Sequence, residues 1–317
     1  MATGGSKKAI VAALLANLGI AVAKFVGFLL TRASSMLAES VHSLADSGNQ
    51  GLLLFGGSRS RREATPEHPF GYARDRYFWS FVVAVVLFAL GSLFSLFEGV
   101  HKLAHPEPIR SALIAVIILV VGIVLESFSF RTAIVEANHV RHGQGWWEFI
   151  RHAKTPELPV VLLEDLGALV GLVLALIGVG LAVTTGDPAW DAYGTLAIGT
   201  LLGVIAIILA VEMKSLLIGE AASTRDLEQI RAAITGTPNV VDLIHVKTQH
   251  LGPEELLVAA KVRLDPSLSF NEVVTTIDLA ERTVRETVPA ATLMYIEPDI
   301  EAAPQPVSPS CGHAGRS

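Results

Sequence analysis

The chain has 317 residues, of which 51% are hydrophobic and only 17% are charged, and its mean hydropathy is +0.51. This composition excludes an ordinary soluble enzyme and indicates an integral membrane protein. Residues 1–219 carry 16 acidic and 16 basic side chains, whereas residues 220–317 carry 14 acidic and 8 basic ones. The net charge of −6 therefore belongs to the C-terminal part, which is a poor partner for nucleic acid.

Six apolar segments are long enough to cross a lipid bilayer. They run over residues 10–30, 33–57, 77–101, 111–133, 158–183 and 192–211. Helix-breaking prolines separate the third segment from the fourth and the fifth from the sixth. The sequence thus predicts an all-α transmembrane domain of six helices over residues 1–219.

The distribution of lysine and arginine predicts the orientation of these helices. The N-terminus, the loops 58–76 and 131–156 and Lys214 together hold 12 of these residues, whereas the opposite side holds only Arg32, Lys102 and Arg110. Both termini are therefore expected in the cytoplasm, with the protein in the inner membrane if it is bacterial.

The second segment carries a polar stripe. At about 100° per residue its polar side chains project within roughly 80° of one another; they are Ser35, Glu39, His42, Asp46 and Asn49. A polar seam between packed helices is one explanation, but such seams use Ser, Thr and Gly more than His and acids. Ionisable groups are costly in a bilayer, so the stripe is a candidate functional site.

His42 and Asp46 are four residues apart, so both side chains can reach one ion. Imidazole and carboxylate are ligands that zinc accepts. The fifth segment adds Glu164 and Asp165, which differ by about 100° and cannot face the same way. Glu164 shares its face with a stripe of small residues suited to close helix packing, and either acid could meet the second segment.

Beyond Glu220 the pattern changes to that of a small cytoplasmic α+β domain over residues 220–300. Thr224 is a candidate N-cap, and Pro298 is expected to end the last strand. The expected order is αββαβ, a ferredoxin-like arrangement, with helices over 226–234 and 270–288 and strands over 240–250, 256–264 and 292–296. Residues 301–317 are rich in Pro, Ser and Gly and are expected to be disordered.

The chain resembles the cation diffusion facilitator family, in particular its zinc transporter 9-like branch. The resemblance covers roughly residues 8–300 and is carried by the motifs AESVHSLADSGNQ (38–50), HPFGY (68–72), RYFW (76–79) and VLLED (161–165). It implies a membrane metal site at His42, Asp46 and Asp165. The family usually has a fourth ligand where this chain has Val161, so Glu164, Asn49, Glu126 or a water would complete the shell.

The resemblance also implies further features. A second metal site is possible in the loop after the second segment, where Glu63, Glu67 and His68 lie. In the tail, His245 occupies a ligand position of some members, but Lys261 and Ile296 stand where others would be, so the tail is expected to serve homodimerisation. From the residues themselves and not from the resemblance, Glu39, Asn49 and Glu126 are expected either to line the ion path or to pair charges, Glu126 with Lys24 or Arg131.

The sequence thus predicts a secondary transporter, not an enzyme, that exports a divalent cation, with Zn²⁺ first, in exchange for protons. Its ligands bind protons as well as metal, so the two are linked, and an unperturbed histidine titrates near neutral pH. No nucleotide-binding motif is present and no cofactor is expected. The alternatives are Mn²⁺ or Fe²⁺ transport and a membrane scaffold or regulator that has lost transport.

Overall fold

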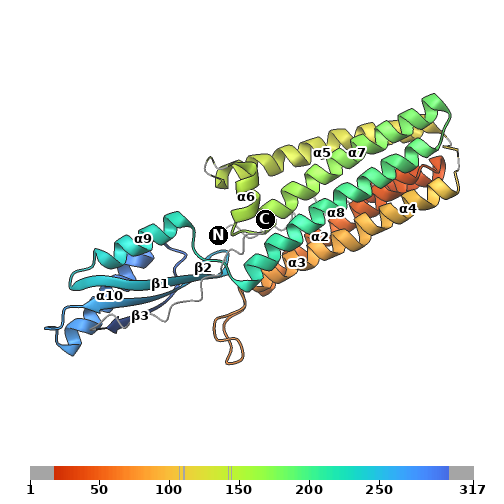
Figure 1. The fold of residues 1–317 in the computed structure, drawn as a ribbon. Helices are drawn as coiled ribbons and strands as arrows, with labels where there is room; N and C mark the ends of the chain where they lie inside the picture. The colour runs from red at the N-terminus through yellow and green to blue at the C-terminus, as the bar shows by residue number, and fades with distance from the viewer. Residues whose placement is uncertain (1–17, 107, 110, 142, 144, 300–317) are drawn as a thin grey trace, which may run out of the picture. The chain divides into compact units, whose positions relative to one another are not determined.

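The computed structural model describes residues 18–299 except 107, 110, 142 and 144. The chain divides into two compact units, Met1–Ile218 and Gly219–Ser317. In its described part the first unit is a helix bundle and the second contains a sheet with two helices (Figure 1). Two predicted segments lie outside the described residues. They are the start of the first predicted span, residues 10–17, and the C-terminal segment predicted to be disordered, residues 301–317.

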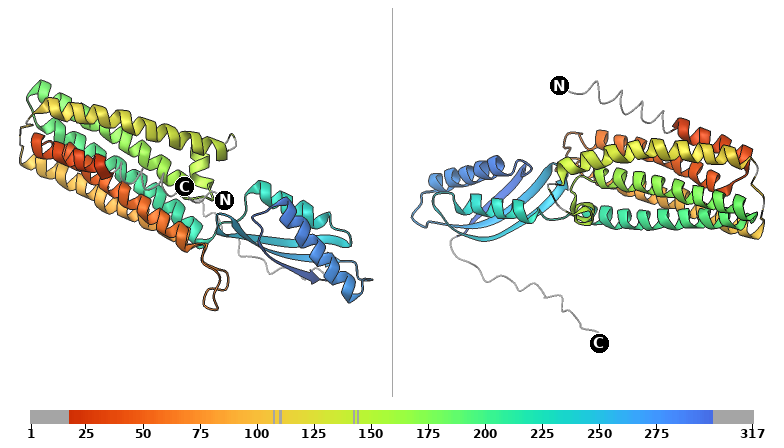
Figure 2. Two further views of the ribbon diagram at one scale, coloured as in Figure 1. Left: turned by 180° about the vertical axis from the view of Figure 1, so that it is seen from behind. Right: turned by 90° about the horizontal axis from the view of Figure 1, so that it is seen from above.

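Helices make up the described part of the first unit, and the long ones run side by side (Figure 2). They are Leu18–Thr31, α2 (Ser34–Arg59), α3 (Asp75–Val86), the π-helix η1 (Leu87–Ser92), α4 (Leu93–Ala104), α5 (Ala112–Val140), the short α6 (Trp146–His152), α7 (Glu157–Thr185) and α8 (Ala189–Ile218). In the described chain, four continuous helices are long and apolar enough to cross a membrane. They are Asp75–Ala104, which consists of α3, η1 and α4, and the helices α5, α7 and α8. The helical unit is therefore of membrane type.

Two parts of the helical unit differ from the sequence prediction. Helix α5 was expected to end at residue 133 but continues to Val140, and α6 lies in what was expected to be a plain loop. Hydropathy marks where a chain leaves the apolar layer, not where its backbone hydrogen bonds stop. The polar residues after Arg131 lower the hydropathy of the last turns of α5, so the prediction ended the helix too early.

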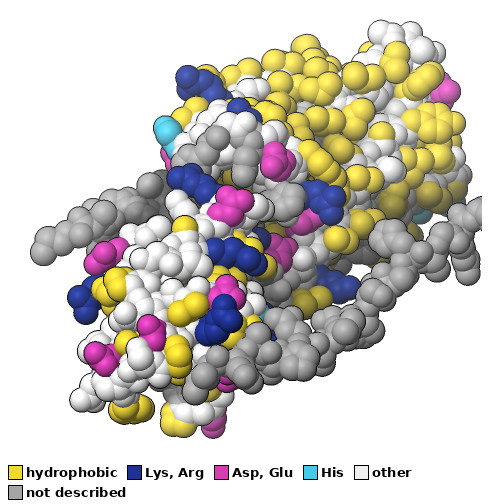
Figure 3. Space-filling view, turned by 60° about the vertical axis from the view of Figure 1, so that its left-hand side comes forward, with side chains coloured by type: hydrophobic (Ala, Val, Ile, Leu, Met, Phe, Trp, Pro, Cys, Tyr) yellow, Lys and Arg dark blue, Asp and Glu magenta, His cyan; other side chains and the backbone are white. Residues whose placement is uncertain are grey.

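Apolar side chains cover the flank of the helical unit, and others form clusters within it (Figure 3). Met36, Leu119 and Leu172 belong to one buried cluster, and Val160 and Leu209 to another. Along α2 and α7, the polar residues of the predicted site lie between the segments that contribute to these two clusters. The site is thus enclosed in the apolar bundle.

The second unit is an α+β domain. Its elements are α9 (Thr224–Thr235), β1 (Val240–Gly252), β2 (Glu255–Leu264), α10 (Phe270–Thr287) and β3 (Leu293–Asp299). The sheet has the order β1-β2-β3, in which β2 runs antiparallel to β1 and parallel to β3. Val258 and Ala260 of β2 pack with Ile230 of α9 and Val284 of α10 in one core, so both helices cover the same face of the sheet.

Two local predictions for this unit were wrong. The N-cap of α9 is Ser223, not Thr224: the Ser223 hydroxyl accepts a hydrogen bond from the Asp226 amide at 3.1 Å. Pro298 does not end β3 but lies inside it, opposite Val262. A proline is tolerated there because β3 is an edge strand, where one amide need not pair.

Candidate metal site

Helix α2 turns its polar face inward. Glu39, His42 and Asn49 are completely buried, and the Asp46 side chain is only 14% exposed. On the opposite side Leu44 is 56% exposed, as an apolar side chain facing lipid would be. The helix is therefore apolar outside and polar inside, and its polar groups have only the bundle interior as a partner.

Acidic side chains from two other helices meet this face. Glu164 of α7 is buried and accepts a hydrogen bond from the Asn49 amide at 2.8 Å. Asp165, also on α7, accepts one from the Ser129 hydroxyl of α5 at 2.9 Å. Glu126 lies three residues before Ser129, so it projects from nearly the same side of α5. Helix α7 thus presents two carboxylates, both held by hydrogen bonds, and α5 presents one.

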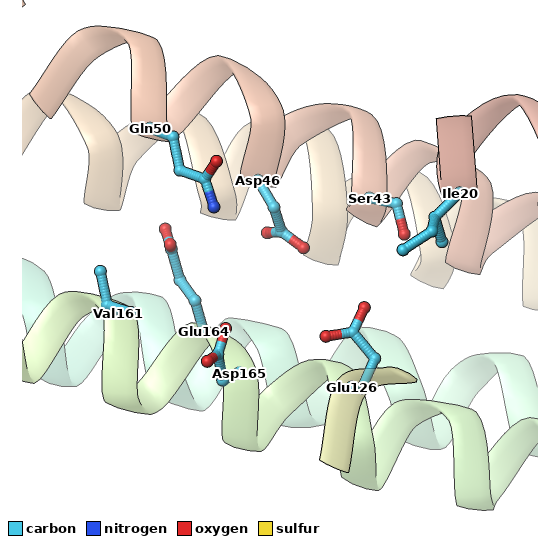
Figure 4. Close-up of a pocket in the computed structure, with 8 residues that line it drawn as sticks. All are labelled: Ile20, Ser43, Asp46, Gln50, Glu126, Val161, Glu164 and Asp165. Atoms are coloured by element: carbon cyan, nitrogen blue, oxygen red, sulfur yellow. The ribbon is translucent and has the colours of Figure 1, made fainter. Parts of the chain in front are cut away.

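These acids line one narrow cavity. Its wall consists of Ile20, Ser43, Asp46, Gln50, Glu126, Val161, Glu164 and Asp165, and its volume is about 10 Å³, about what one water molecule or one bare metal ion needs. The side chains of Asp46, Glu126 and Glu164 point toward the space between α2, α5 and α7, and Asp165 lies beside Glu164 on α7 (Figure 4). Four carboxylates around so small a space repel one another unless protons or a cation neutralise them.

Several buried polar atoms on α2 lack a hydrogen-bond partner among the described residues. They are Glu39 Oε1, both ring nitrogens of His42, Asp46 Oδ1 and Asn49 Oδ1. His42 Nδ1 is 3.4 Å from Asp46 Oδ1, but the two groups are not aligned for a hydrogen bond. Buried polar groups are rarely left unsatisfied. Free imidazole nitrogens beside carboxylate oxygens are what a divalent cation needs as ligands.

The candidate ligands do not converge fully in this conformation. Within the described part of the chain, no three His, Cys, Asp or Glu side chains are close enough together to hold one metal ion. His42 is not in the cavity wall, although its neighbour Ser43 is. Val161 does line the cavity but offers no ligand atom, whereas Glu164 lies in the wall one turn later.

Comparison with known proteins identifies the family. Residues 10–218 match the cation efflux transmembrane domain, and residues 222–299 match the cytoplasmic domain of cation efflux proteins. The chain belongs to the cation diffusion facilitator family. Its similarity to relatives described below places it in the zinc transporter 9-like branch of that family.

Curated relatives in animals, plants and bacteria are similar to this chain. The human "Proton-coupled zinc antiporter SLC30A9, mitochondrial" is 33% identical over 244 residues, which are 76% of this chain and 43% of that protein. "Metal tolerance protein C4" of Arabidopsis thaliana is 30% identical over 283 residues, 89% of this chain and 61% of the relative. The chain thus spans less than half of the human antiporter's length. "Magnetosome protein MamB" of Paramagnetospirillum magneticum is 22% identical over 92% of this chain and 94% of that protein.

Two further metal sites come into question from the sequence, one in the loop after α2 and one in the second unit. Both have fewer suitable ligands than the site on α2 and α7. In the loop after α2, Glu63, Glu67 and His68 are all exposed, and the His68 ring packs against Tyr72 with 4.6 Å between ring centroids. A loop site at Glu67 and His68 remains a prediction.

In the tail, His245 and Lys261 are register partners on the face of the sheet away from the helices, whereas Ile296 points into the core. The Lys261 ammonium lies 2.9 Å from Asp299 and 3.4 Å from Glu297. The hydrogen bond to Asp299 and the two negative charges raise the pKa of Lys261. A permanent cation therefore stands directly beside His245, which disfavours a metal ion there.

Sequence reasoning missed three side chains that shape the site. Gln50 and Ser43 line the cavity, and Ser129 anchors Asp165. The signal for Gln50 was present, because it lies four residues after Asp46 on the same stripe. Ser129 could not have been found, because its role depends on how α5 packs against α7.

Proposed function

We propose that this chain is a secondary transporter that exports a divalent cation, with Zn²⁺ as the first candidate, from the cytoplasm in exchange for protons. One observation carries the proposal: α2 presents unpartnered, buried nitrogen and oxygen atoms next to a cavity ringed by four carboxylates. The names of the curated relatives, among them a proton-coupled zinc antiporter, agree with it.

The proposed ligands are His42, Asp46, Asp165 and, as the fourth, Glu164. Each binds a proton as well as a metal ion, so entry of the ion displaces protons and return of the protons releases the ion. Helices α2 and α7 would open the site to one side of the membrane and then to the other. The transported ion and protons are the only substrates that the proposal requires, and no cofactor takes part.

The proposed architecture has six membrane-spanning helices with both termini in the cytoplasm. Helix α2 is long enough to span a bilayer, and its buried polar stripe explains why its composition alone does not place it among the four apolar spans. The helix that contains Leu18–Thr31 would be the first span. We further propose a ferredoxin-like cytoplasmic domain that holds two copies of the chain together, in agreement with the match to the cation efflux cytoplasmic domain.

The ligand set also favours a second candidate ion. One imidazole among several carboxylates is richer in oxygen than a typical zinc site, and oxygen ligands suit harder ions such as Mn²⁺ or Fe²⁺. The choice between these ions is therefore part of the test.

The test is metal flux into proteoliposomes that contain the purified full chain, under an imposed pH gradient, with Zn²⁺, Mn²⁺ and Fe²⁺ offered separately. We expect gradient-dependent flux that is lost in Asp46→Ala and Asp165→Ala. Asp187→Asn is the matched control, because Asp187 is an exposed acid in the α7–α8 connection and its variant should transport normally.

Folded protein that moves none of the three metals would contradict the proposal. It would favour instead a membrane scaffold or regulator, with Val161 as the lost ligand. Full transport by Asp46→Ala would contradict the assignment of the site while leaving the transporter function standing.

A further inference from the structure

A lysine lies buried beside the acidic cavity. Lys24, on the helix Leu18–Thr31, is 1% exposed. Its ammonium donates hydrogen bonds to Glu39 Oε2 at 3.1 Å and to Ser43 Oγ at 2.8 Å. Among the described residues of the helical unit, the other buried lysine is Lys102, which is 6% exposed and donates to the Arg32 carbonyl at 2.9 Å.

The ammonium of Lys24 is separated from the cavity by a single hydroxyl. Ser43, which accepts one of its hydrogen bonds, is itself part of the cavity wall together with Asp46 and Glu126. Figure 4 shows Ser43 on the same helix as Asp46 and opposite Glu126. In an apolar interior a charge at this range acts on an ion in the cavity with little screening.

Glu39 holds the ammonium in this place. Its second oxygen, Oε1, has no hydrogen-bond partner among the described residues. That oxygen lies against Gly171 of α7, where an added Cβ would be only 2.5 Å away. The missing side chain at Gly171 thus makes room for a carboxylate whose contact with Lys24 is its strongest interaction, because the pair lies deep in a low-dielectric interior.

We infer that Lys24 is a built-in cation that weakens metal binding at the cavity and so speeds release of the ion, and that Glu39 is the tether that keeps its ammonium out of the cavity. The inference rests on the proposed transport function. A site that binds an ion must also let it go, and a fixed positive charge beside four carboxylates limits how tightly they hold a divalent cation. Without its tether, the long and flexible lysine side chain would reach the carboxylates and compete with the metal.

The two halves of this ion pair therefore have opposite expected effects, which a purely structural pair would not have. Lys24→Met should tighten Zn²⁺ binding about tenfold, within the usual range for coupled sites, and should lower both KM and kcat of flux. Glu39→Gln should weaken binding by about the same factor and raise KM. The double variant, which buries no unpaired charge, should bind as Lys24→Met does.

The measurement is equilibrium Zn²⁺ binding to the purified full chain, followed by flux in proteoliposomes. Lys102→Met is the matched control, since it removes a buried lysine near a helix end and should leave the Kd unchanged. Equal or parallel shifts in Lys24→Met and Glu39→Gln would overturn the inference while wild-type binding and transport upheld the proposed function. A double variant with wild-type affinity would also overturn it. Wild-type protein that bound no metal would contradict both this inference and the proposed function.

Discussion

Gly171 of α7 lies in close contact with a buried charged group, the Glu39 carboxylate. It belongs to a small-residue stripe of α7 that packs mainly against α8, and it is the point where the Glu39 carboxylate of α2 touches α7. Glu39 cannot move away easily, because its other oxygen is bound to Lys24 inside the bundle. A side chain at position 171 would therefore meet a group that is fixed from the opposite side.

Gly171→Ala is expected to lower the free energy of unfolding by about 1–3 kcal/mol, the usual range for overpacking a buried contact. The measurement is thermal unfolding of the purified chain in detergent. Gly180→Ala on the same helix is the matched control, because an added Cβ there meets nothing within 4 Å, and it should be neutral or slightly stabilising. Equal stability of the two variants would show that Glu39 is free to move.

Glu272 gives a prediction about pH for the tail. Hydrogen bonds from the Ser269 hydroxyl and amide to its carboxylate lower the pKa of Glu272 in the folded state. A carboxyl with a depressed folded pKa stabilises the fold above its unfolded value, near 4.3, and this contribution disappears as the pH falls through the folded value. Glu272→Gln should therefore destabilise α10 at pH 7 and have little effect below about pH 3.

The check is the thermal unfolding of the tail, followed in the full chain by circular dichroism between pH 3 and pH 7. Glu286→Gln, also on α10 and without a hydrogen bond or ion pair to the described residues, is the control. A difference between Glu272→Gln and wild type that stayed constant over this range would contradict the capping role.

The site residues that sequence could predict are those with a local signature. His42 and Asp46 share a helix face by spacing alone, and Glu164 and Asp165 stood out as acids in an apolar helix. The partner of Glu126 was left open between Lys24 and Arg131, and the structure instead joins Lys24 to Glu39. That choice depends on which helices are neighbours, and the spacing of residues along one helix does not contain this information.

At the scale of elements, the start of α2 shows a cap supplied from a distant helix. Its N-cap residue is Ala33, which has no side chain to satisfy the first amides. Asp191 of α8, completely buried, takes this role. It accepts hydrogen bonds from the amide and hydroxyl of Ser34 at 2.8 and 3.0 Å and from those of Ser35 at 3.4 and 2.5 Å. Ser35, the first residue of the polar stripe, thus takes part in capping the start of α2 by its hydrogen bonds to Asp191.

Asp191→Asn should lower stability by about 1–3 kcal/mol, because it removes a negative charge from a helix N-terminus and leaves buried donors poorly satisfied. Thermal unfolding in detergent measures the effect. Glu98→Gln on α4 is the control, since its carboxylate has no hydrogen bond or ion pair to the described residues. If Asp191→Asn also abolished Zn²⁺ binding without loss of stability, the residue would belong to the ion path and not to the cap.

Helix positions followed from hydropathy, but helix ends and local helix type did not. The apolar segments predicted at 77–101 and 158–183 lie inside the observed helices Asp75–Ala104 and α7. The π-turn of η1 was not predicted, because one extra residue in a helical turn barely alters an apolar run. The tail's order of elements was predicted from alternation and caps, whereas the parallel pairing of β3 with β2 depends on the whole sheet.

At the scale of the molecule, we propose that two copies of the chain meet through the face of the sheet that α9 and α10 leave uncovered. Leu257 and Leu293, and then Ala259 and Tyr295, are register partners on this face, away from α9 and α10. Tyr295 is 59% exposed in the single chain. The same face carries His245 and Lys261 farther along β1 and β2. An exposed aromatic side chain beside leucine and alanine is typical of the centre of a protein interface.

Tyr295→Asp should convert the proposed dimer to monomer, because it would bury a carboxylate in an apolar contact. Light scattering of the purified full chain after size-exclusion chromatography measures the mass. Phe270→Asp is the matched control: Phe270 is 80% exposed at the start of α10, and its replacement should leave the mass unchanged. A wild-type monomer would contradict the proposed dimer, and a Tyr295→Asp dimer would place the contact elsewhere.

The connection between the first helix and α2 also bears on how the chain is made. Only Arg32 and Ala33 separate the two helices. A lysine or aspartate at the centre of a helix that inserts alone costs about 2.5–3.5 kcal/mol. The helix Leu18–Thr31 carries Lys24, and α2 carries Glu39 and Asp46. With so short a turn, both helices can leave the translocon together, with the Lys24–Glu39 pair already formed. We therefore expect these two helices to insert as one hairpin, so that the polar helix α2 does not meet lipid alone.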